Sequence, residues 1–291
     1  MTVTRRGFIA LFGVVAARLF YLQIVDGADL ASAAESNRTN VATLHAKRGT
    51  IYDRNGNVLA MSIDCSTIYC NPQNVHDPSG LATVLASILG GDYNDYLADV
   101  TKDTTFVYIQ RQVDTDVVKR LKSELSDKDI EGVYYLDDTK RVYPYGGTCG
   151  QILGVVGTDG QGITGLELQY DDILTGTDGE MIMETGLGGT PIAGGTYEVT
   201  DAVNGTDVIL GIDVNIQEKA ETALVDAVKT YKAESGSILV MNPKTGEIHC
   251  ACSTPLADVS DLSTVDSDGL TLKLVSMSYE PGSVFKVITT S

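Results

Sequence analysis

The segment Tyr-Glu-Pro-Gly-Ser-Val-Phe-Lys-Val-Ile-Thr at residues 279–289 places a turn signal directly before an apolar run. Pro281-Gly282 breaks whatever precedes it, so the pattern predicts a helix that begins at or near Ser283. Ser283 and Lys286 lie three positions apart, a spacing that one helical turn brings to the same face. The segment therefore predicts a hydroxyl and an amine within reach of each other.

This pair has a catalytic and a structural interpretation. A serine hydroxyl is a poor nucleophile until a base removes its proton, and a buried lysine can have its pKa lowered enough to act as that base. A helix N-terminus near Ser283 would also favour developing negative charge. However, S-x-x-K spacing often arises by chance, and a serine N-cap followed by a solvated Lys286 explains the same residues. Spacing alone leaves both interpretations open.

Regular secondary-structure patterns precede this segment. Apolar positions 216, 220, 224, 227, 228 and 231 form one stripe of a predicted helix, and Asn215 with Glu218 three residues later is typical of a capped start. Residues 237–241 and 247–252 predict two strands joined by a turn at 242–246. Residues 207–253 are thus expected to form a helix followed by a β-hairpin.

The middle of the chain has shorter and less regular secondary-structure patterns. Asn55-Gly56 lies between two alternating apolar runs within residues 47–62, which is the strongest short hairpin signal. Residues 81–125 mix helical stretches with polar connections. Of the 30 glycines, 15 fall between Gly146 and Gly195, which predicts loops and short elements. Within that stretch residues 160–165 fit G-x-G-x-x-G, but a lone fingerprint is weak, so we interpret it as a loop leading into a short helix.

The N-terminus predicts a membrane segment. Residues 7–25 are apolar apart from Arg18 and Gln23, and as a helix they match a hydrocarbon core of about 30 Å. Arg5 and Arg6 precede the segment, so the positive-inside rule leaves a short stub in the cytoplasm. The alternatives are a twin-arginine export signal and cleavage after a small-residue site at residues 31–33. Each alternative delivers the bulk of the chain outside.

Composition excludes several classes of protein. The 291 residues include 21 Lys+Arg and 39 Asp+Glu, a formal net charge of −18, so no basic face large enough for nucleic acid can form. The five cysteines are odd in number, which argues against a disulfide framework. Cys250 and Cys252 would share one strand face as small buried hydrophobes. The acidic pairs at 137–138 and 171–172 are expected on the solvated surface. No metal or cofactor is expected.

Several segments, taken in order, resemble class B penicillin-binding proteins, the bacterial cell-wall transpeptidases. The resemblance covers essentially the whole chain, and each segment alone is modest. The segments are the membrane stretch ending in Arg18-Leu19 and Leu22-Gln23, residues 48–56 (RGTIYDRNG), 141–144 (RVYP), 165–167 (GLE) with Tyr170 and Leu174, 242–248 (NPKTGEI) and 280–286 (EPGSVFK).

The resemblance implies an α+β fold in three parts. Residues 1–25 would form a cytoplasmic stub and membrane anchor, 26–205 a non-catalytic, dimerisation-like pedestal, and 206–291 the N-terminal part of an α/β serine transpeptidase domain. It also implies that Ser283 attacks the D-alanyl-D-alanine end of a peptidoglycan stem peptide, with Lys286 as proton acceptor. Penicillins would be covalent inhibitors. The expected location is the cell membrane, with the bulk outside, and the expected partners are a membrane glycosyltransferase and division or elongation proteins.

The sequence also departs from the family pattern. Family members carry S-x-N and K-T-G after S-x-x-K, whereas no S-x-N occurs here and Lys244-Thr245-Gly246 precedes the serine in a predicted turn. We therefore expect this chain to be the N-terminal portion of a longer enzyme and to be inactive alone. Two alternatives are a non-catalytic membrane-anchored scaffold for wall-synthesis partners, and a β-lactam sensor or β-lactamase, which shares S-x-x-K.

Overall fold

The computed structural model describes residues 15–16, 18–26, 39–184, 197–261 and 267–290. Two compact units divide the chain, one comprising residues 1–44 with 178–202 and the other residues 45–177 with 203–291. Among the described residues, no helix has the length and apolar character needed to cross a membrane. Residues 7–14 and 17 of the predicted anchor at 7–25 lie outside the described residues, as does the candidate cleavage site at 31–33.

The first unit contains a three-stranded antiparallel sheet. Its strand order is β1 (Thr39–Leu44), β6 (Gly179–Glu184) and β7 (Tyr197–Thr200), so residues 135 or more positions apart pair directly, for example Leu44 with Gly179. A five-residue π-helix, Tyr21–Val25, precedes this sheet in the chain. Strands β1 and β6 pair over six positions without a register shift.

The second unit is organised around the long strand β3 (Val58–Cys70). Strands β4 (Val107–Asp114) and β5 (Val133–Val142) flank β3 in antiparallel register, and β2 (Ile51–Tyr52) pairs with its start. Strand β8 (Val208–Ile209) adds to β2 in parallel. The predicted hairpin at Asn55-Gly56 is confirmed: Gly56 connects β2 to β3 with φ of +85°, a left-handed value that favours glycine.

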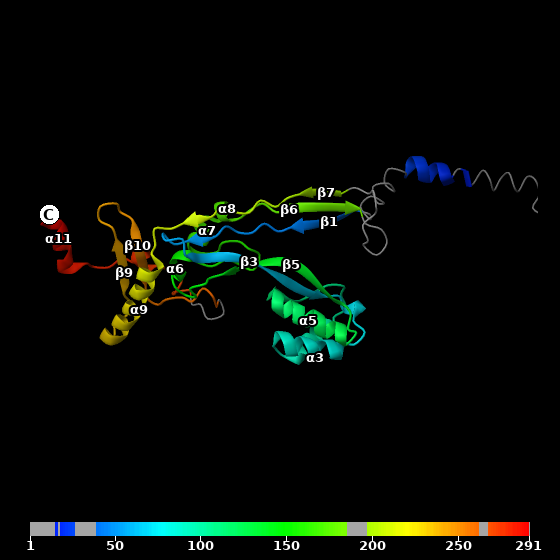
Figure 1. The fold of residues 1–291 in the computed structure, drawn as a ribbon, viewed down its shortest axis with the longest axis horizontal. Coiled ribbons are helices and arrows are strands. Elements are labelled where there is room, and N and C mark those ends of the chain that lie inside the picture. Colours follow the sequence, from blue (N-terminus) through cyan, green and yellow to red (C-terminus); the bar gives the residue numbers. More distant parts are fainter. Residues whose placement is uncertain (1–14, 17, 27–38, 185–196, 262–266, 291) are drawn as a thin grey trace, which may run out of the picture. The chain divides into compact units, whose positions relative to one another are not determined.

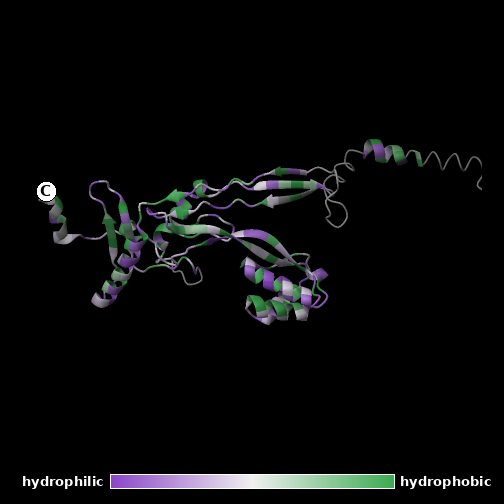
Figure 2. Cartoon of the chain, in the orientation of Figure 1, coloured by the Kyte–Doolittle hydropathy of each residue, from purple (hydrophilic) through white to green (hydrophobic). Residues whose placement is uncertain are grey.

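Three helices cover one face of this sheet. They are α3 (Pro78–Leu89), α4 (Tyr93–Val100) and α5 (Thr115–Asp127), and Figure 1 shows α3 and α5 side by side next to β3 and β5. Figure 2 shows α3 as largely hydrophobic and α5 as more hydrophilic along its length. Leu81, Leu85 and Leu121 are fully buried between the helices and the strands. The helical stretch predicted after residue 81 is thus confirmed.

The glycine-rich region consists of short elements, as expected. Its helices are α6 (Gly150–Leu153), α7 (Gly165–Gln169) and α8 (Asp171–Leu174), and residues 185–196 lie outside the described residues. A second hydrophobic core packs this region against the β2–β3 hairpin and against the start of helix α9 (Val214–Tyr231). Its members include Ile51, Leu59, Leu153, Leu174 and Val214.

The last part of the second unit matches the predicted helix and hairpin. Helix α9 (Val214–Tyr231) packs on strands β9 (Ser237–Met241) and β10 (Ile248–Ser253), which pair in antiparallel register. The short helices η2 (Pro72–Asn74), α10 (Lys273–Ser276), η3 (Gly282–Phe285) and α11 (Lys286–Thr289) complete the described elements. The mixed α and β content agrees with the expected class.

Two details of α9 were predicted wrongly. Its N-cap is Asp213 and not Asn215, because the Asp213 carboxylate accepts hydrogen bonds from the backbone N–H groups of Asn215 and Ile216 at 3.0 and 3.2 Å. The predicted apolar stripe is confirmed at Ala220, Leu224 and Val228, which pack in the core under α9. It is wrong at its two ends, since Ile216 is 38% exposed and Tyr231 is 82% exposed. The buried face instead includes two polar residues, which are Gln217 and Glu221.

Candidate functional site

The candidate nucleophile and base lie on consecutive short helices. Ser283 is in the 3₁₀ helix η3, and Lys286 is the first residue of α11. Both side chains are exposed, and among the described residues neither Ser283 Oγ nor Lys286 Nζ makes a hydrogen bond. The predicted helix start near Ser283 is present, because η3 begins at Gly282, the residue before Ser283, with φ of +59°. The catalytic roles of the two side chains stay a prediction.

Gln151 and Ser253 fix the chain that leads towards this pair. The Gln151 side chain donates to the carbonyl oxygens of Pro255 and Gly269, both at 2.9 Å, and accepts from the Ser253 N–H at 2.9 Å. Ser253 Oγ in turn accepts from the backbone N–H of Lys273 at 2.9 Å. Because Gln151 and Ser253 are buried, these bonds hold the start of α10 against the end of β10.

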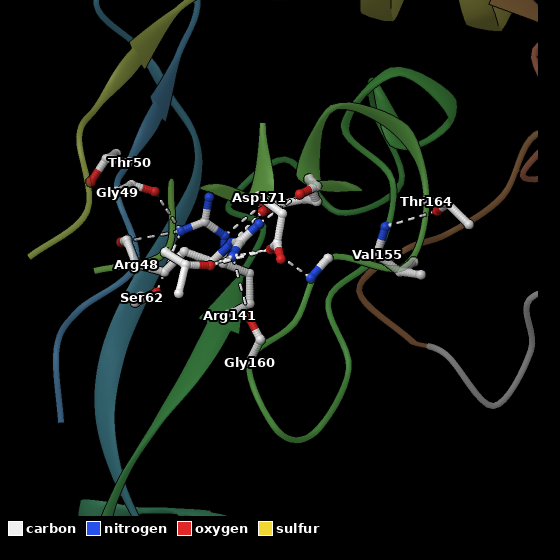
Figure 3. Close-up of polar contacts among 12 residues, drawn as sticks. Arg48, Gly49, Thr50, Ser62, Arg141, Val155, Gly160, Thr164 and Asp171 are labelled. Atoms are coloured by element: carbon white, nitrogen blue, oxygen red, sulfur yellow. Dashed lines mark hydrogen bonds and ion pairs between the residues drawn. The ribbon is translucent and has the colours of Figure 1, made fainter. Parts of the chain in front are cut away.

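A buried ion network joins three of the segments that carry the family resemblance. Glu167 is completely buried and binds Arg48 Nε through Oε2 at 2.6 Å and Arg141 Nε through Oε1 at 2.8 Å. Arg48 also donates to the Glu167 carbonyl oxygen at 2.7 Å. Figure 3 shows the two arginine side chains converging on one spot from different parts of the chain. One carboxylate thus holds together two guanidinium groups that would otherwise repel each other.

Asp171 extends this network and corrects an expectation. The pair at 171–172 was expected to be solvated surface, but Asp171 Oδ1 accepts from Arg48 Nη1 at 2.7 Å and from the Gly162 N–H at 2.8 Å. Burial would raise the pKa of Asp171, but the hydrogen bonds from Gly162 and Arg48 outweigh it and the pKa is lowered. Asp172 alone is exposed as expected.

The G-x-G-x-x-G stretch serves this network. The Gly160 carbonyl oxygen accepts a hydrogen bond from Arg48 Nη1 at 3.3 Å. A Cβ at Gly162 would lie 2.1 Å from the carbonyl oxygen of Glu167. Gly165 begins α7 with φ of +62°. The interpretation as a loop leading into a short helix is confirmed, and Gly162 is needed for close backbone packing against Glu167.

Asp53 connects the β2–β3 turn to helix α9. Its carboxylate accepts from the backbone N–H groups of Asn55 and Asn57, both at 2.8 Å, and from the N–H of Val214 at 3.3 Å. Burial would raise the pKa of Asp53, but the hydrogen bonds, above all those from Asn57, lower it. The charged form of Asp53 thus stabilises both the turn and the start of α9.

A second buried carboxyl group lies under α9. Glu221 Oε1 accepts from the backbone N–H of Cys149 at 3.1 Å and from Gln217 Nε2 at 2.7 Å. Burial raises the pKa of Glu221, because these two hydrogen bonds do not compensate for lost hydration. Cys250 and Cys252 lie nearby on one face of β10 and are buried, as predicted.

Comparison with known proteins identifies the family. Residues 43–210 match the penicillin-binding protein dimerisation domain, and residues 236–291 match the penicillin-binding protein transpeptidase domain. The chain belongs to the penicillin-binding proteins. The resemblance stated from the sequence is confirmed, and the ion network lies within the dimerisation domain of this penicillin-binding protein.

Individual relatives support the same family. The chain is 33% identical over 291 residues to the stage V sporulation protein D of Bacillus subtilis, covering 97% of this chain and 44% of the relative. It is 29% identical to the peptidoglycan D,D-transpeptidase FtsI of Escherichia coli, covering 92% and 46%. The penicillin-binding protein thus spans about half the length of the curated relatives it matches.

Solved structures agree in fold. A peptidoglycan synthetase from Bifidobacterium adolescentis matches with a TM-score of 0.59 and 30% identity, covering 87% of this chain and 51% of that one. Penicillin-binding protein 2X from Streptococcus thermophilus matches with a TM-score of 0.55 and 29% identity, covering 83% and 38%.

The contacts of the ion network are what the sequence did not reveal. Arg48, Arg141 and Glu167 were each noted within a family segment, but no pattern placed them together because they are separated by up to 119 positions. Only Glu167 offered a signal, because it is a charged residue between two leucines in the glycine-rich stretch, whereas Arg48 and Arg141 each follow a lysine in a polar segment.

Proposed function

We propose that this chain forms part of a peptidoglycan D,D-transpeptidase that cross-links stem peptides by serine acyl transfer. The observation that carries the proposal is the match of residues 236–291 to the transpeptidase domain, because this range contains the S-x-x-K pair of Ser283 and Lys286. Relatives named peptidoglycan D,D-transpeptidases support it.

In the proposed reaction, Ser283 Oγ attacks the carbonyl carbon of the terminal D-alanyl-D-alanine bond. The hydroxyl proton passes to the neutral amine of Lys286 and from there to the nitrogen of the departing D-alanine, while an ester forms on Ser283. An amine of a second stem peptide then attacks the ester, loses a proton and releases Ser283 Oγ in its protonated form. A β-lactam would acylate the same oxygen by opening of its ring.

The remaining elements of the proposal concern organisation. Residues 1–25 would anchor the protein in the cell membrane, 26–205 would form the pedestal, and 206–291 would begin the transpeptidase domain. The resemblance and the hydropathy of residues 7–25 support this division. The proposed partners are a membrane glycosyltransferase and division or elongation proteins, and the proposed location of the bulk is outside the membrane.

The exposure of Ser283 and Lys286 favours one alternative for the chain by itself, which is a scaffold that holds partners without catalysing transfer. Labelling with a fluorescent penicillin distinguishes the two functions. We expect the complete natural protein to be labelled covalently and Ser283→Ala to abolish the label. Ser276→Ala, which removes another exposed hydroxyl only seven residues away, is the matched control and should label normally. A label that persists in Ser283→Ala would refute the nucleophile assignment, and no label in the natural protein would favour the scaffold.

A further inference from the structure

A cavity of about 480 Å³ opens beside the buried ion network. Four of the residues that line it are cations, and no Asp or Glu of the described chain lines it, although acidic residues outnumber basic ones by 39 to 21 in the whole sequence. The four cations are Arg48, Arg111, Lys140 and Arg141. Cationic groups therefore cluster around this cavity although the chain as a whole has a net charge of −18.

One guanidinium group at this cavity has unused donors. Arg141 binds Glu167 through Nε and donates from Nη1 to the carbonyl oxygen of Gly49 at 2.8 Å, but no described residue accepts from Nη2. Its side chain is only 5% exposed, and burial lowers the pKa of Arg141. A buried charged donor without an acceptor is unfavourable, because it has lost its hydration and gained no hydrogen bond in exchange. An acceptor inside the cavity would remove this cost.

Two further residues with unusual features, Tyr143 and Gln112, line the same cavity. The hydroxyl of Tyr143 is buried there; its oxygen lies against the backbone N–H of Val156, and no described residue accepts a hydrogen bond from its O–H. Gln112, also in the lining, adopts φ of +54°, which is a strained value for a residue with a Cβ. A bulge in β4, where Arg111 and Gln112 both lie opposite Thr67, accounts for this conformation.

Charge balance decides which anion fits. Glu167 and Asp171 already offset the charges of Arg48 and Arg141, while Asp159 pairs with Arg111 at 2.7 Å and Asp114 with Lys140 at 2.6 Å. The cavity therefore has spare donors but little excess positive charge. This combination favours a singly charged carboxylate over a doubly charged phosphate.

The walls indicate the rest of the ligand. Val142, Val156 and Val259 contribute apolar surface beside the polar donors, and the volume lies within the range of about 300–1,000 Å³ that is usual for small-molecule sites. We propose that this cavity binds a small monocarboxylate with an apolar body, whose carboxylate accepts hydrogen bonds from Arg141 Nη2 and the Tyr143 hydroxyl. The proposal is independent of acyl transfer at Ser283.

Calorimetric titration of the 291-residue chain tests this proposal. The probes are N-acetylalanine, N-acetylalaninamide and inorganic phosphate. The amide has the same body without the charge, so we expect the acid to bind at least tenfold more tightly than the amide and than phosphate. Equal affinity for acid and amide, tighter binding of phosphate, or no binding of the acid would overturn the proposal.

Two variants locate the site without disturbing the ion network. Val156→Phe fills the cavity from its apolar wall, and we expect it to weaken binding of N-acetylalanine at least tenfold. Val203→Phe, at a 65% exposed position, is the matched control and should bind normally. Circular dichroism establishes that both variants are folded. If folding fails in Val156→Phe, the shift of the Arg141 side-chain N–H signals on addition of N-acetylalanine replaces it, and unshifted signals would contradict the proposal.

Discussion

The side-chain amide of Gln217 pairs with both backbone polar groups of Ala251, accepting from its N–H at 3.0 Å and donating to its carbonyl oxygen at 2.9 Å. A helix side chain thus occupies the position that a neighbouring strand would take beside β10. Gln217 is buried, so these bonds are shielded from water. On the same edge of β10, the His249 carbonyl oxygen accepts from the Asp213 N–H at 2.9 Å, so Gln217 satisfies the part of the edge at Ala251.

Replacing Gln217 by Leu should destabilise the protein by about 1–3 kcal/mol, because two buried backbone groups of Ala251 would lose their partner. Urea unfolding followed by circular dichroism measures the change. Glu218→Leu makes the same residue at the neighbouring exposed position of α9 and should change stability by less than about 0.5 kcal/mol. Equal effects of the two variants would show that the Gln217–Ala251 pairing contributes little.

Glu221 should make the folded state less stable as the pH rises. Its pKa is raised in the folded protein, so the protonated carboxyl is favoured there. The stabilisation is complete below the unfolded pKa of about 4.3 and is lost as the pH rises through the higher folded value. Glu221→Gln keeps the acceptor for Cys149 and removes this loss. We expect the stability of Glu221→Gln relative to the natural protein to increase between pH 4 and pH 8, and a constant difference would contradict the raised pKa.

Glu167→Gln should be among the most destabilising changes in the second unit. It leaves two buried guanidinium groups without the charge that binds them, and breaking a buried ion pair in this way costs about 3–5 kcal/mol. Glu124→Gln provides the control, because it removes a carboxylate from an exposed pair with Lys128. Exposed pairs contribute about 0–1 kcal/mol, so the two urea midpoints should differ clearly. Similar midpoints would mean that the network is not essential to stability.

The N-cap of α9 can be tested by a pair of alanine substitutions. Asp213→Ala removes the acceptor for two backbone N–H groups and should cost about 0.5–2 kcal/mol in unfolding free energy. Asn215→Ala should cost less, since the carboxylate of Asp213 is the cap and Asn215 contributes only its backbone N–H to it. A larger loss in Asn215→Ala would restore the cap expected from the sequence.

The sequence predicts local structure well where neighbouring residues decide it. The Asn55-Gly56 turn, the β9–β10 hairpin and α9 each depend on contacts within a few positions. Gln217 and Glu221 were missed on the buried face of α9 because they are polar, and only their hydrogen bonds to the backbone of distant residues explain their burial. The assignment of Ser283 and Lys286 rests on a short motif and stays a prediction.

The ion network also has a consequence for synthesis of the chain. Arg48 leaves the ribosome 119 residues before Glu167, the residue that neutralises it. At a translation rate of roughly 5–20 residues per second, Glu167 is synthesised about 6–24 s after Arg48. Until then β3 and its flanking strands can pair, but the junction of the three segments cannot close. The order of synthesis therefore sets the earliest moment at which the dimerisation domain can complete its fold.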